Sequence, residues 1–551
     1  MGALAEPVSQ AAADGLLTGG QALVRALRAH GVTRVFGIPG THNLEIHRHL
    51  PAYGIDHVTP RHEQGAGYAA DGYARVTGRP GVVLTTTGPA LLNAAAAVGE
   101  AYADSVPLLV VSPGMPLGHP RLATGALHEM RSQTDALRGV AAFSHRVSSV
   151  AEIDAAVARA FTLFRIRRPR PAHIEVPLDL LTATQVLGPV RRAPCALLPA
   201  PAPAAVRRAV TALSGARRPA LVLGGGAVGA RAQCLALAER LGAPVVTTAA
   251  GKGTVAETHP LSLGVSLHSL AVQKWLATRD AVLAVGTELS ESDFWTAPPP
   301  LDGTLVRVDL DPDQMYAGAA VDVPLVADAR LALEALLTEL PDDRHARVPR
   351  KKPHTRVAGE VAALRAARDT ETAARDARWI PYLRAVRAVL AADAVITSDS
   401  AQCCYYGALP HLPVGPEGRY LHPTGFGTLG YALPAALGAK VAEPHRQVLA
   451  LSGDGGLQFT VQELATAAQL RLPLPIVVFD NGGYGEIRDE MRARGDAPAA
   501  VDLAPVDLPA LARAYGGHGT RACDPAALAG AVTEALDRPG PTLITVPEET
   551  P

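Results

Sequence analysis

Two polar turns near the carboxyl end of the sequence carry residue types that can hold a metal ion and a phosphate group. Asp454 follows the apolar run "HRQVLALSG", and Asn481 follows the apolar run "LPIVVFD". Carboxylate and amide oxygens suit a hard cation such as Mg²⁺, whose coordination is commonly completed by phosphate oxygens. Gly453, Gly455 and Gly456 would let the backbone come close to such a ligand, and a helix beginning there would offer it free N–H groups.

The elements around these turns explain how the two residues could meet. Segment 457–472 has apolar residues at helical spacing and lies between the two apolar runs, so the order is strand, helix and strand. The carboxyl ends of parallel strands meet at one edge of a sheet, where ligands bind. We therefore expect Asp454 and Asn481 to face one small volume. The alternative, that both turns are only tight connections, stays open on spacing alone.

Short apolar runs alternate with alanine-rich amphipathic segments along all 551 residues, which predicts an α/β protein with buried parallel strands. The proline-rich segment 187–206 and the basic, proline-containing segment 341–357 are predicted to be linkers. The blocks that they separate have the ordinary size of domains. We expect three doubly wound parallel-sheet domains at residues 15–186, 203–342 and 375–545.

The composition excludes several classes of protein. Lysine and arginine total 51 and aspartate and glutamate total 52, so no overall charge attracts the chain to nucleic acid or to an anionic membrane. The five cysteines are few and odd in number, which argues against a disulfide framework. No targeting signal or membrane-spanning run is visible. These features predict a cytoplasmic protein with a compact small-molecule partner.

The motif that runs from "GDGG" at position 453 to "DNGG" at position 480 resembles the thiamine diphosphate signature of a known family. That family contains acetolactate synthase, benzoylformate decarboxylase and related 2-oxoacid decarboxylases. The resemblance implies that Asp454, Asn481 and the carbonyl oxygen of Gly483 bind Mg²⁺, which holds the diphosphate of the cofactor. Asp480 stands where the family usually has asparagine, and we expect its carboxylate to point away from the metal.

The family resemblance also covers the first block, where it gives one glutamate a catalytic role. Glu63 begins the segment "EQGAGYAADGYAR". The ordinary explanation for an acid at a helix start is an exposed residue favoured by the helix dipole. The segment resembles the family's catalytic glutamate helix, which implies that Glu63 hydrogen-bonds N1′ of the aminopyrimidine. The bond favours the imino tautomer, whose nitrogen removes the thiazolium C2 proton before the ring serves as electron sink for CO2 loss.

Further cofactor contacts follow from the same resemblance. The carbonyl of Gly427 would accept a hydrogen bond from the 4′-amino group, and Leu429 would force the bent shape of the cofactor. Gln402 would contact the diphosphate, and Asn93 lies in a loop near the cofactor. That loop departs from the family pattern at Ala90, where glycine is common.

The domains would then be the pyrimidine-binding, central and diphosphate-binding domains of the family. In the family the two halves of the cofactor site come from different subunits, so the resemblance implies a homodimer or homotetramer.

The middle block offers a competing cofactor. Gly224, Gly226 and Gly229 form a G-x-G-x-x-G motif after a strand and before a helix, which is typical of dinucleotide-binding oxidoreductases. The next strand ends in threonines where an acidic ribose contact is expected, which argues against NAD. The block also resembles the family's central domain, which binds FAD in some members. We do not favour a flavin.

Four polar residues in the expected active-site loops are candidate substrate contacts: His42, His128, Gln133 and Glu486. Each alone is more simply an ordinary loop residue, but together they indicate a polar pocket. His128 stands where some decarboxylases of the family carry histidine, so it could donate a proton after CO2 leaves. A buried Glu486 would need a cationic partner.

The chain looks most like the branch of the family that includes 5-guanidino-2-oxopentanoate decarboxylase. We therefore predict non-oxidative decarboxylation of a 2-oxoacid, with a basic side chain as the candidate. The main alternative is a carboligase of the acetolactate synthase or carboxyethylarginine synthase type, which shares every residue named above. Two other classes are an oxidoreductase that uses the middle block and a binding subunit without catalysis. The presence of Glu63, Asp454 and Asn481 argues against the binding subunit.

Overall fold

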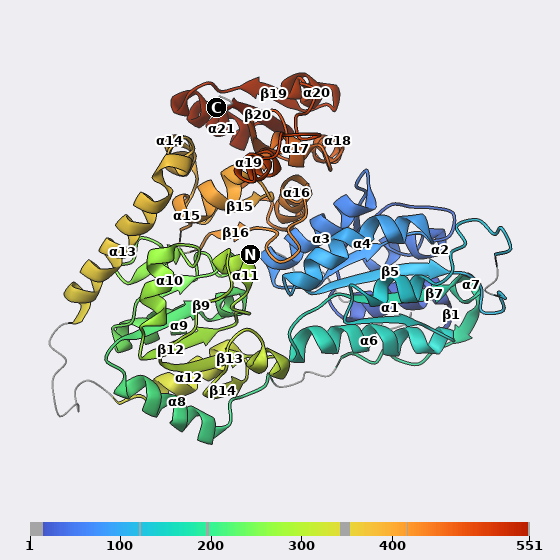
Figure 1. Ribbon diagram of the computed structural model, residues 1–551. Coiled ribbons are helices and arrows are strands. Elements are labelled where there is room, and N and C mark those ends of the chain that lie inside the picture. Colours follow the sequence, from blue (N-terminus) through green and yellow to red (C-terminus); the bar gives the residue numbers. More distant parts are fainter. Residues whose placement is uncertain (1–14, 121–122, 194–197, 342–352, 416, 549–551) are drawn as a thin grey trace, which may run out of the picture. The chain divides into compact units, whose positions relative to one another are not determined.

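The computed structural model describes residues 15–120, 123–193, 198–341, 353–415 and 417–548 (Figure 1). These residues form two compact units. Unit 1 combines residues 15–193 with two short segments from the last third of the chain, Leu437–Glu443 and Gln462–Gln469, and unit 2 contains the rest. Three six-stranded sheets form the framework, and every strand pair described within them is parallel. This confirms the predicted α/β class.

The first sheet lies in unit 1 and has the strand order β3-β2-β4-β5-β7-β6. Its strands are β2 (Arg34–Gly37), β3 (Asp56–Val58), β4 (Gly81–Leu84), β5 (Leu108–Gly114), β6 (Phe143–Arg146) and β7 (Ala172–Pro177). The helices of this part are α1 (Gly19–Ala29), α2 (Leu44–His47), α3 (Glu63–Thr77), α4 (Pro89–Ala103), α5 (Gln133–Arg138), α6 (Val150–Ile166) and α7 (Leu178–Thr182). Helix α3 packs against α4, and α1 packs against α6. Strands β1 (Leu16–Thr18) and β8 (Thr184–Val186) form a separate antiparallel pair.

The second sheet lies in unit 2 and has the order β11-β10-β9-β12-β13-β14, the arrangement of dinucleotide-binding folds. Its strands are β9 (Pro219–Leu223), β10 (Val245–Thr247), β11 (Ser262–Val265), β12 (Ala281–Val285), β13 (Thr304–Asp309) and β14 (Val323–Val326). The helices along this sheet are α8 (Pro203–Gly215), η3 (Gly225–Ala230), α9 (Arg231–Leu241), α10 (Leu270–Ala277), α11 (Glu291–Phe294), η4 (Pro312–Tyr316) and α12 (Ala329–Glu339).

The third sheet, also in unit 2, has the order β16-β15-β17-β18-β20-β19. Its strands are β15 (Val395–Ser398), β16 (Arg419–Leu421), β17 (Val448–Gly453), β18 (Leu474–Asp480), β19 (His518–Arg521) and β20 (Pro541–Pro547). The helices of this part of the chain are α14 (Ile380–Val389), η6 (Cys403–Ala408), α15 (Leu409–His411), α16 (Ala432–Ala442), α17 (Asp454–Leu457), α18 (Glu463–Gln469), α19 (Gly485–Ala493), α20 (Leu508–Ala514) and α21 (Pro525–Asp537). When the strands of each sheet are numbered from its own first strand, the first and third sheets have the same order. The two blocks therefore share one architecture, a likeness too weak to claim from the sequence.

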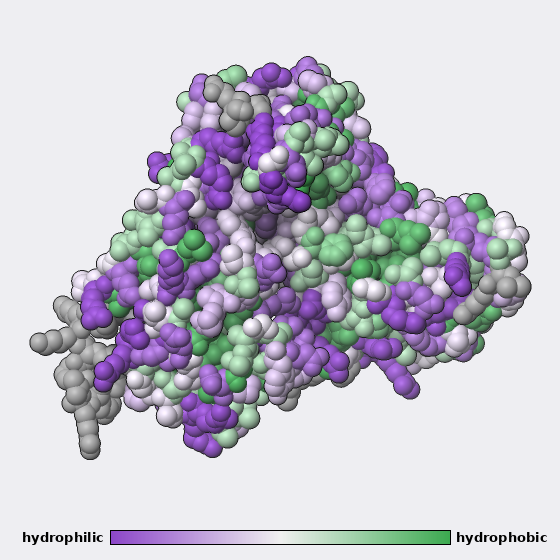
Figure 2. Space-filling view, viewed as in Figure 1, coloured by the Kyte–Doolittle hydropathy of each residue, from purple (hydrophilic) through white to green (hydrophobic). Residues whose placement is uncertain are grey.

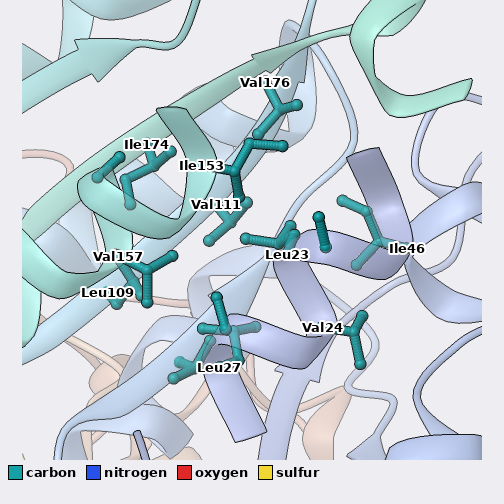
Figure 3. Packing of buried hydrophobic residues seen from close by; sticks show 14 of the residues in the cluster. Leu23, Val24, Leu27, Ile46, Leu109, Val111, Ile153, Val157, Ile174 and Val176 are labelled. Carbon is teal, nitrogen blue, oxygen red and sulfur yellow. The ribbon is translucent and has the colours of Figure 1, made fainter. Parts of the chain in front are cut away.

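The core of unit 1 shows why the helices take these positions. Figure 3 shows side chains of α1 and α6 packing against the strands, among them Leu23, Leu27, Ile153, Val157, Leu109, Val111, Ile174 and Val176. The helical residues of this set lie four positions apart on each helix, all eight side chains are buried, and the remaining four belong to β5 and β7. Each fully buried aliphatic side chain contributes about 1.5–3 kcal/mol relative to exposure. The helices thus cover the sheet, and the loops at the carboxyl ends of the strands are the segments that can carry site residues.

The second predicted linker is partly helical. Helix α13 (Pro353–Asp376) begins within segment 341–357, and residues 342–352 lie outside the described residues. Arg365 donates to the carbonyl oxygens of Glu257 and His259, which ties α13 to the second sheet. The linker prediction was wrong for 353–357 and also for 203–206, where α8 begins within the first predicted linker, because a proline is tolerated in the first turn of a helix. The domain boundaries expected from the sequence stay predictions.

The chain's surface and its cysteines fit the expectations from composition. Hydrophilic and hydrophobic side chains are interspersed on the face shown in Figure 2. No helix among the described residues has both the length and the apolar character needed to cross a bilayer. The cysteines within the described ranges, Cys234, Cys403, Cys404 and Cys523, are all free thiols.

His173 on β7 gives unit 1 a dependence on pH. Its ring is fully buried between Ser112 Oγ, 2.8 Å from Nε2, and Ser144 Oγ, 2.7 Å from Nδ1. Burial lowers the pKa of His173 to about 3, whereas a histidine in the unfolded chain has a pKa of about 6.5. The unfolded chain therefore takes up a proton first as the pH falls. The contribution of the neutral His173 ring to the free energy of unfolding is fully present above the unfolded-state pKa and decreases as the pH falls below it.

We expect the wild type to lose about 2 kcal/mol of unfolding free energy through this group between pH 7.5 and pH 5. His173→Gln should lack that part of the loss, because glutamine does not titrate. Denaturant unfolding at the two pH values measures the difference. His445→Gln, at an exposed position, should retain the full wild-type dependence. Equal pH dependence in His173→Gln and wild type would contradict the assignment.

Candidate active site

The turns after β17 and β18 bring Asp454 and Asn481 together in unit 2. Asp454 is the first residue of α17, directly after β17, and Asn481 directly follows β18. The backbone N–H of Asn481 donates to Asp454 Oδ1 over 3.2 Å. Burial raises the pKa of Asp454 to about 6. The two residues therefore share one small, partly buried volume, as the sequence predicts.

The oxygens of this volume fit a hard cation. Asn481 Oδ1 is buried and has no hydrogen-bond partner among the described residues. A methyl group built on Gly455 would lie 3.3 Å from the carbonyl oxygen of Gly483, so that carbonyl reaches the turn that holds Asp454. Gly483 has φ of +149° and lies against the carbonyl of Val501, which leaves no room for a side chain. A carboxylate, an amide oxygen and a backbone carbonyl form an oxygen set of the type that Mg²⁺ prefers.

Asp480, the departure from the family pattern, is engaged locally. Its Oδ1 accepts a hydrogen bond from the backbone N–H of Gly482 over 3.3 Å. Burial is the main cause of the raised pKa of Asp454, and the negative charge of Asp480 raises it further. The hydrogen bond from Asn481 N–H acts in the opposite direction and lowers it. Asp480 thus stabilises the turn that carries Asn481.

Asp399 connects the loops of this half-site and was missed by sequence reasoning. It follows β15, is fully buried, and accepts hydrogen bonds from Gly430 N–H and Ser452 Oγ, both over 2.9 Å. A methyl group on Gly456 would lie 3.1 Å from Asp399 Oδ2. Burial raises its pKa to about 6. One carboxylate therefore joins the ends of β15 and β17 to the loop that follows β16. The sequence signal that could have identified Asp399 is an acidic residue directly after a buried strand.

Gly427 and Leu429 lie in the loop that Asp399 holds at Gly430. Gly427 is exposed and has φ of +64°, a conformation that favours glycine. Leu429 is half-buried. The positions suit a loop that presents a backbone carbonyl and an apolar side chain, and the cofactor contacts expected of both stay predictions.

Gln402 and Glu486 are brought together by the structure. Gln402 Nε2 donates to Glu486 Oε2 and to Asp489 Oδ2, both over 2.9 Å. Glu486 Oε1 accepts a hydrogen bond from the hydroxyl of Tyr406 over 2.7 Å. Burial, and then this hydrogen bond, raises the pKa of Tyr406. Two carboxylates one turn apart on α19 thus form an acidic face beside the metal turn, whereas the diphosphate contact expected of Gln402 stays a prediction.

In unit 1, Glu63 lies at the first position of α3, with His62 as the N-cap. Its carboxylate is half-exposed, and Asn93 Nδ2 donates to Oε2 over 2.9 Å. Asn93 lies in α4, which begins at Pro89 directly after Gly88, whose φ is +62°. The expected loop around Ala90 and Asn93 is therefore a helix. Because Ala90 is helical, its methyl group does not disturb the backbone that the family commonly builds with glycine.

His42 and His128 share a hydroxyl group. Thr87 Oγ1 lies 2.5 Å from His42 Nδ1 and 3.3 Å from His128 Nδ1, and the ring centroids are 5.4 Å apart. A hydroxyl has one hydrogen, so it donates to one neutral ring while the other ring donates to it. Partial burial, and then the charge of His128, lowers the pKa of His42. His128 has φ of +60°, a backbone conformation that few non-glycine residues adopt.

Gln133 holds the turn beneath this pair. Its Oε1 accepts from Gly88 N–H over 2.5 Å, and its Nε2 donates to the carbonyl of Pro113 over 2.7 Å. A cavity of about 180 Å³ lies beside it and is lined by His128 and Arg131 among other polar residues. Gln133 therefore joins the turn at Gly88 to the end of β5 at Pro113, and the substrate contact expected of it stays a prediction.

Replacing Thr87 by valine should lower kcat about tenfold or more, because the two imidazole rings lose their shared partner while the buried volume is preserved. Thr87→Ser keeps the hydroxyl and should stay near the wild-type value. Steady-state kinetics with a 2-oxoacid measures both variants. A Thr87→Val enzyme with wild-type kcat would show that the hydroxyl does not order the rings.

The glycine motif of the central sheet packs against its neighbour. The N–H groups of Gly224 and Gly226 donate to the carbonyls of Val285 and Gly286, over 2.9 and 3.0 Å. Side chains at 224 or 226 would collide with Gly286. Because two N–H groups of this turn already have carbonyl partners, they are not free to bind a pyrophosphate. Close packing of two loops explains Gly224 and Gly226, whereas a side chain at Gly229 would meet nothing within 4 Å.

The three domains of the chain match those of thiamine pyrophosphate enzymes. Models of that family match residues 17–136 as the N-terminal TPP binding domain, residues 206–336 as the central domain and residues 401–546 as the C-terminal TPP binding domain. The chain belongs to the thiamine pyrophosphate enzyme family, which confirms the resemblance drawn from its motifs.

The chain is similar to named members of this family over most of its length. It is 44% identical over 509 residues to a probable 2-ketoarginine decarboxylase, AruI, of Pseudomonas aeruginosa, covering 91% of this chain and 88% of that one. It is 34% identical over 496 residues to an acetolactate synthase of Arthrospira platensis, with 86% and 83% covered. It is 31% identical over 543 residues to the large subunit of acetolactate synthase isozyme 3 of Escherichia coli, with 95% and 93% covered.

Proposed function

We propose that this protein catalyses the thiamine diphosphate-dependent, non-oxidative decarboxylation of 5-guanidino-2-oxopentanoate, which is 2-ketoarginine. The 44% identity to the probable 2-ketoarginine decarboxylase, spread over 91% of the chain, carries the proposal. The placement of Glu63 at the start of α3 and the oxygen set around Asp454 support the chemistry.

Each half-site has a defined task in this proposal. Asp454, Asn481 and the Gly483 carbonyl would hold the Mg²⁺ that binds the diphosphate, and Asn481 Oδ1, which is buried without a hydrogen-bond partner among the described residues, supports this. Thiamine diphosphate, when bound, supplies the electron sink for CO2 loss. Glu63, oriented by the hydrogen bond from Asn93, would hydrogen-bond N1′ of the aminopyrimidine. His128 would donate the proton that replaces CO2.

The acidic face on α19 supports a cationic substrate side chain. Glu486 and Asp489 converge on Gln402, and Glu486 also accepts from Tyr406. A guanidinium presents a planar fork of N–H donors that two carboxylates can receive. We propose that Glu486 binds the guanidinium and that Arg131, in the cavity beside His128, receives the substrate carboxylate.

We also propose that the active enzyme is a homodimer or homotetramer and that the central domain binds neither NAD nor FAD. The bonded N–H groups of Gly224 and Gly226 support the second part. The free cysteines are compatible with a cytoplasmic location, which stays a prediction.

The test incubates the protein with thiamine diphosphate, Mg²⁺ and one 2-oxoacid at a time: 5-guanidino-2-oxopentanoate, pyruvate or benzoylformate. Mass spectrometry should find an aldehyde one CO2 lighter than the guanidino acid, and much less product from the other two. No aldehyde from the guanidino acid would refute the proposed substrate.

Carboligation is the second candidate, because the relatives at 31–34% identity named above are acetolactate synthases. A product heavier than the acid supplied would favour it, as two substrate molecules or a substrate and an aldehyde would have been joined. The same mass spectra therefore decide between the two reactions.

A further inference from the structure

The start of helix α3 is held by a carboxylate from a distant part of the sequence. Glu463, the first residue of α18, is fully buried within unit 1. Its Oε1 accepts hydrogen bonds from the backbone N–H groups of Arg61 and His62, each over 3.0 Å. Its Oε2 lies 3.1 Å from Arg61 N and accepts a further bond from Thr466 Oγ1 over 2.7 Å. These N–H groups belong to the two residues directly before Glu63.

The fit between α18 and α3 is close. A methyl group on Gly65 would overlap Glu463 Oε1, so only glycine at that position leaves room for the carboxylate. Arg61 also donates through its guanidinium to Gln469 Oε1, at the other end of α18, over 2.5 Å. The whole of α18 therefore lies along the first turn of α3 and the two residues before it.

Burial disfavours the charged form of Glu463 and therefore raises its pKa, although the hydrogen bonds that it accepts act in the opposite direction. Burying a charged carboxylate costs folding free energy, which the hydrogen bonds that it accepts offset only in part. A carboxylate is acceptor-only and has enough lone pairs to receive two backbone N–H groups and a hydroxyl at once. Glutamine could keep one neutral oxygen for the two backbone N–H groups, but its N–H₂ group would replace Oε2, which accepts from Thr466 Oγ1 and lies near Arg61 N.

We propose that Glu463 is a positioning residue for Glu63: by binding the backbone of Arg61 and His62, it fixes the turn from which the Glu63 carboxylate projects. The inference rests on the role of Glu63 in the proposed function. A displacement of about 1 Å at a reacting group can reduce a rate by about 100-fold. Glu463 would therefore affect catalysis without contacting substrate or cofactor.

The first experiment uses the cofactor-free protein. Hydrogen–deuterium exchange of the peptide that contains residues 58–70 should be faster in Glu463→Gln than in wild type, because a neutral amide oxygen is a weaker acceptor than a carboxylate and Arg61 N–H loses its second acceptor, Oε2. Thr466→Val removes only the hydroxyl bond and should leave that peptide near its wild-type exchange. Unchanged exchange in Glu463→Gln would overturn the structural part of the proposal.

The second experiment reads the effect on Glu63 without a substrate. Exchange of the C2 proton of bound thiamine diphosphate, measured by quenched flow and NMR, should be about 10- to 100-fold slower in Glu463→Gln. Gly65→Ala should show a similar defect, because its methyl group displaces the carboxylate. The double variant should be no worse than the more impaired single variant, since both changes act through one contact.

Glu371→Gln is the matched control for a loss of stability alone. Glu371 accepts from the backbone N–H of Ala271 over 2.8 Å and from Ser269 Oγ over 2.7 Å, at the start of α10 in unit 2. It should lower the unfolding temperature and leave C2 exchange at the wild-type rate. If Glu463→Gln behaves like this control, the role of Glu463 is structural only and the proposal fails.

Glu463→Asp keeps the charge with a shorter reach, and its C2 exchange should lie between wild type and Glu463→Gln. Glu463→Asp also serves as the test if Glu463→Gln does not fold. The proposal would be overturned if folded Glu463→Asp protein showed faster amide exchange in the 58–70 peptide but exchanged the C2 proton at the wild-type rate. C2 exchange needs no 2-oxoacid, so a wrong substrate assignment would leave this result interpretable. Wild-type protein that bound the cofactor but showed no accelerated C2 exchange would refute the proposed function itself.

Discussion

Glu63→Gln is expected to abolish turnover of the 2-oxoacid while thiamine diphosphate still binds, because it replaces the acid that is proposed to hydrogen-bond N1′ of the aminopyrimidine. Glutamine keeps the size of the side chain and its bond to Asn93, but it cannot exchange a proton. Removing a general acid–base group typically lowers a rate by about 10²–10⁴-fold. Steady-state kinetics gives the loss in kcat, and calorimetric titration of the cofactor should give a dissociation constant near that of wild type.

Two variants provide the controls for this result. Asn93→Ala removes the amide that donates to Glu63 Oε2 and should reduce kcat less than Glu63→Gln does, because the acid itself remains. Glu534→Gln, at an exposed position on α21, should be fully active. A Glu63→Gln protein with wild-type kcat would remove Glu63 from the mechanism and with it the proposed reaction.

Asp454→Ala should weaken the binding of Mg²⁺ and thiamine diphosphate by at least about 100-fold, a larger effect than that of losing an outer contact of a metal site. The reason is that the remaining oxygens, the Asn481 amide and the Gly483 carbonyl, carry no full charge to balance the cation. Titration of the apoprotein with cofactor in the presence of Mg²⁺ measures the change. Chelating Mg²⁺ from the wild type should reproduce the variant's weak cofactor binding.

Asp480→Asn is the matched control, since it removes a neighbouring carboxylate and introduces the residue that the family usually has. Its Oδ1 bond to Gly482 can be kept by the asparagine oxygen, so cofactor binding should change less than about tenfold. If Asp480→Asn weakened the cofactor as much as Asp454→Ala, the assignment of the metal-binding carboxylate would be reversed.

Local patterns explain what the sequence could predict. Runs such as Leu474–Asp480 are apolar, short and bounded by turn-forming residues, so strands and their carboxyl ends can be recognised from the order of residues alone. Asp454 and Asn481 each follow such a run directly. The start of α3 at Glu63 also agrees with the prediction, because the apolar and small residues of the helix begin there.

Other residues gave no local signal. Glu463 lies in an amphipathic helix where glutamate is ordinary, and its partners Arg61 and His62 are about 400 residues away. Thr87 is one threonine among three, and only the folded loop places it between two histidines. The division into units likewise follows from tertiary packing, since no break in composition marks Leu437–Glu443 or Gln462–Gln469 as partners of the first sheet.

The interleaving of unit 1 has a consequence for how the protein is made. A ribosome completes residue 193 well before residue 469, and at about 5–20 residues per second the interval is on the order of tens of seconds. During that time the nascent chain holds α3 without its Glu463 partner and without α16, whose Gly438 packs directly on the backbone of Ala69. The first sheet can form early, but the helix that carries Glu63 reaches its final surroundings only after residues 437–469 have been made. A fragment ending at residue 193 would therefore expose the side of α3 that packs against Gly438 and Glu463.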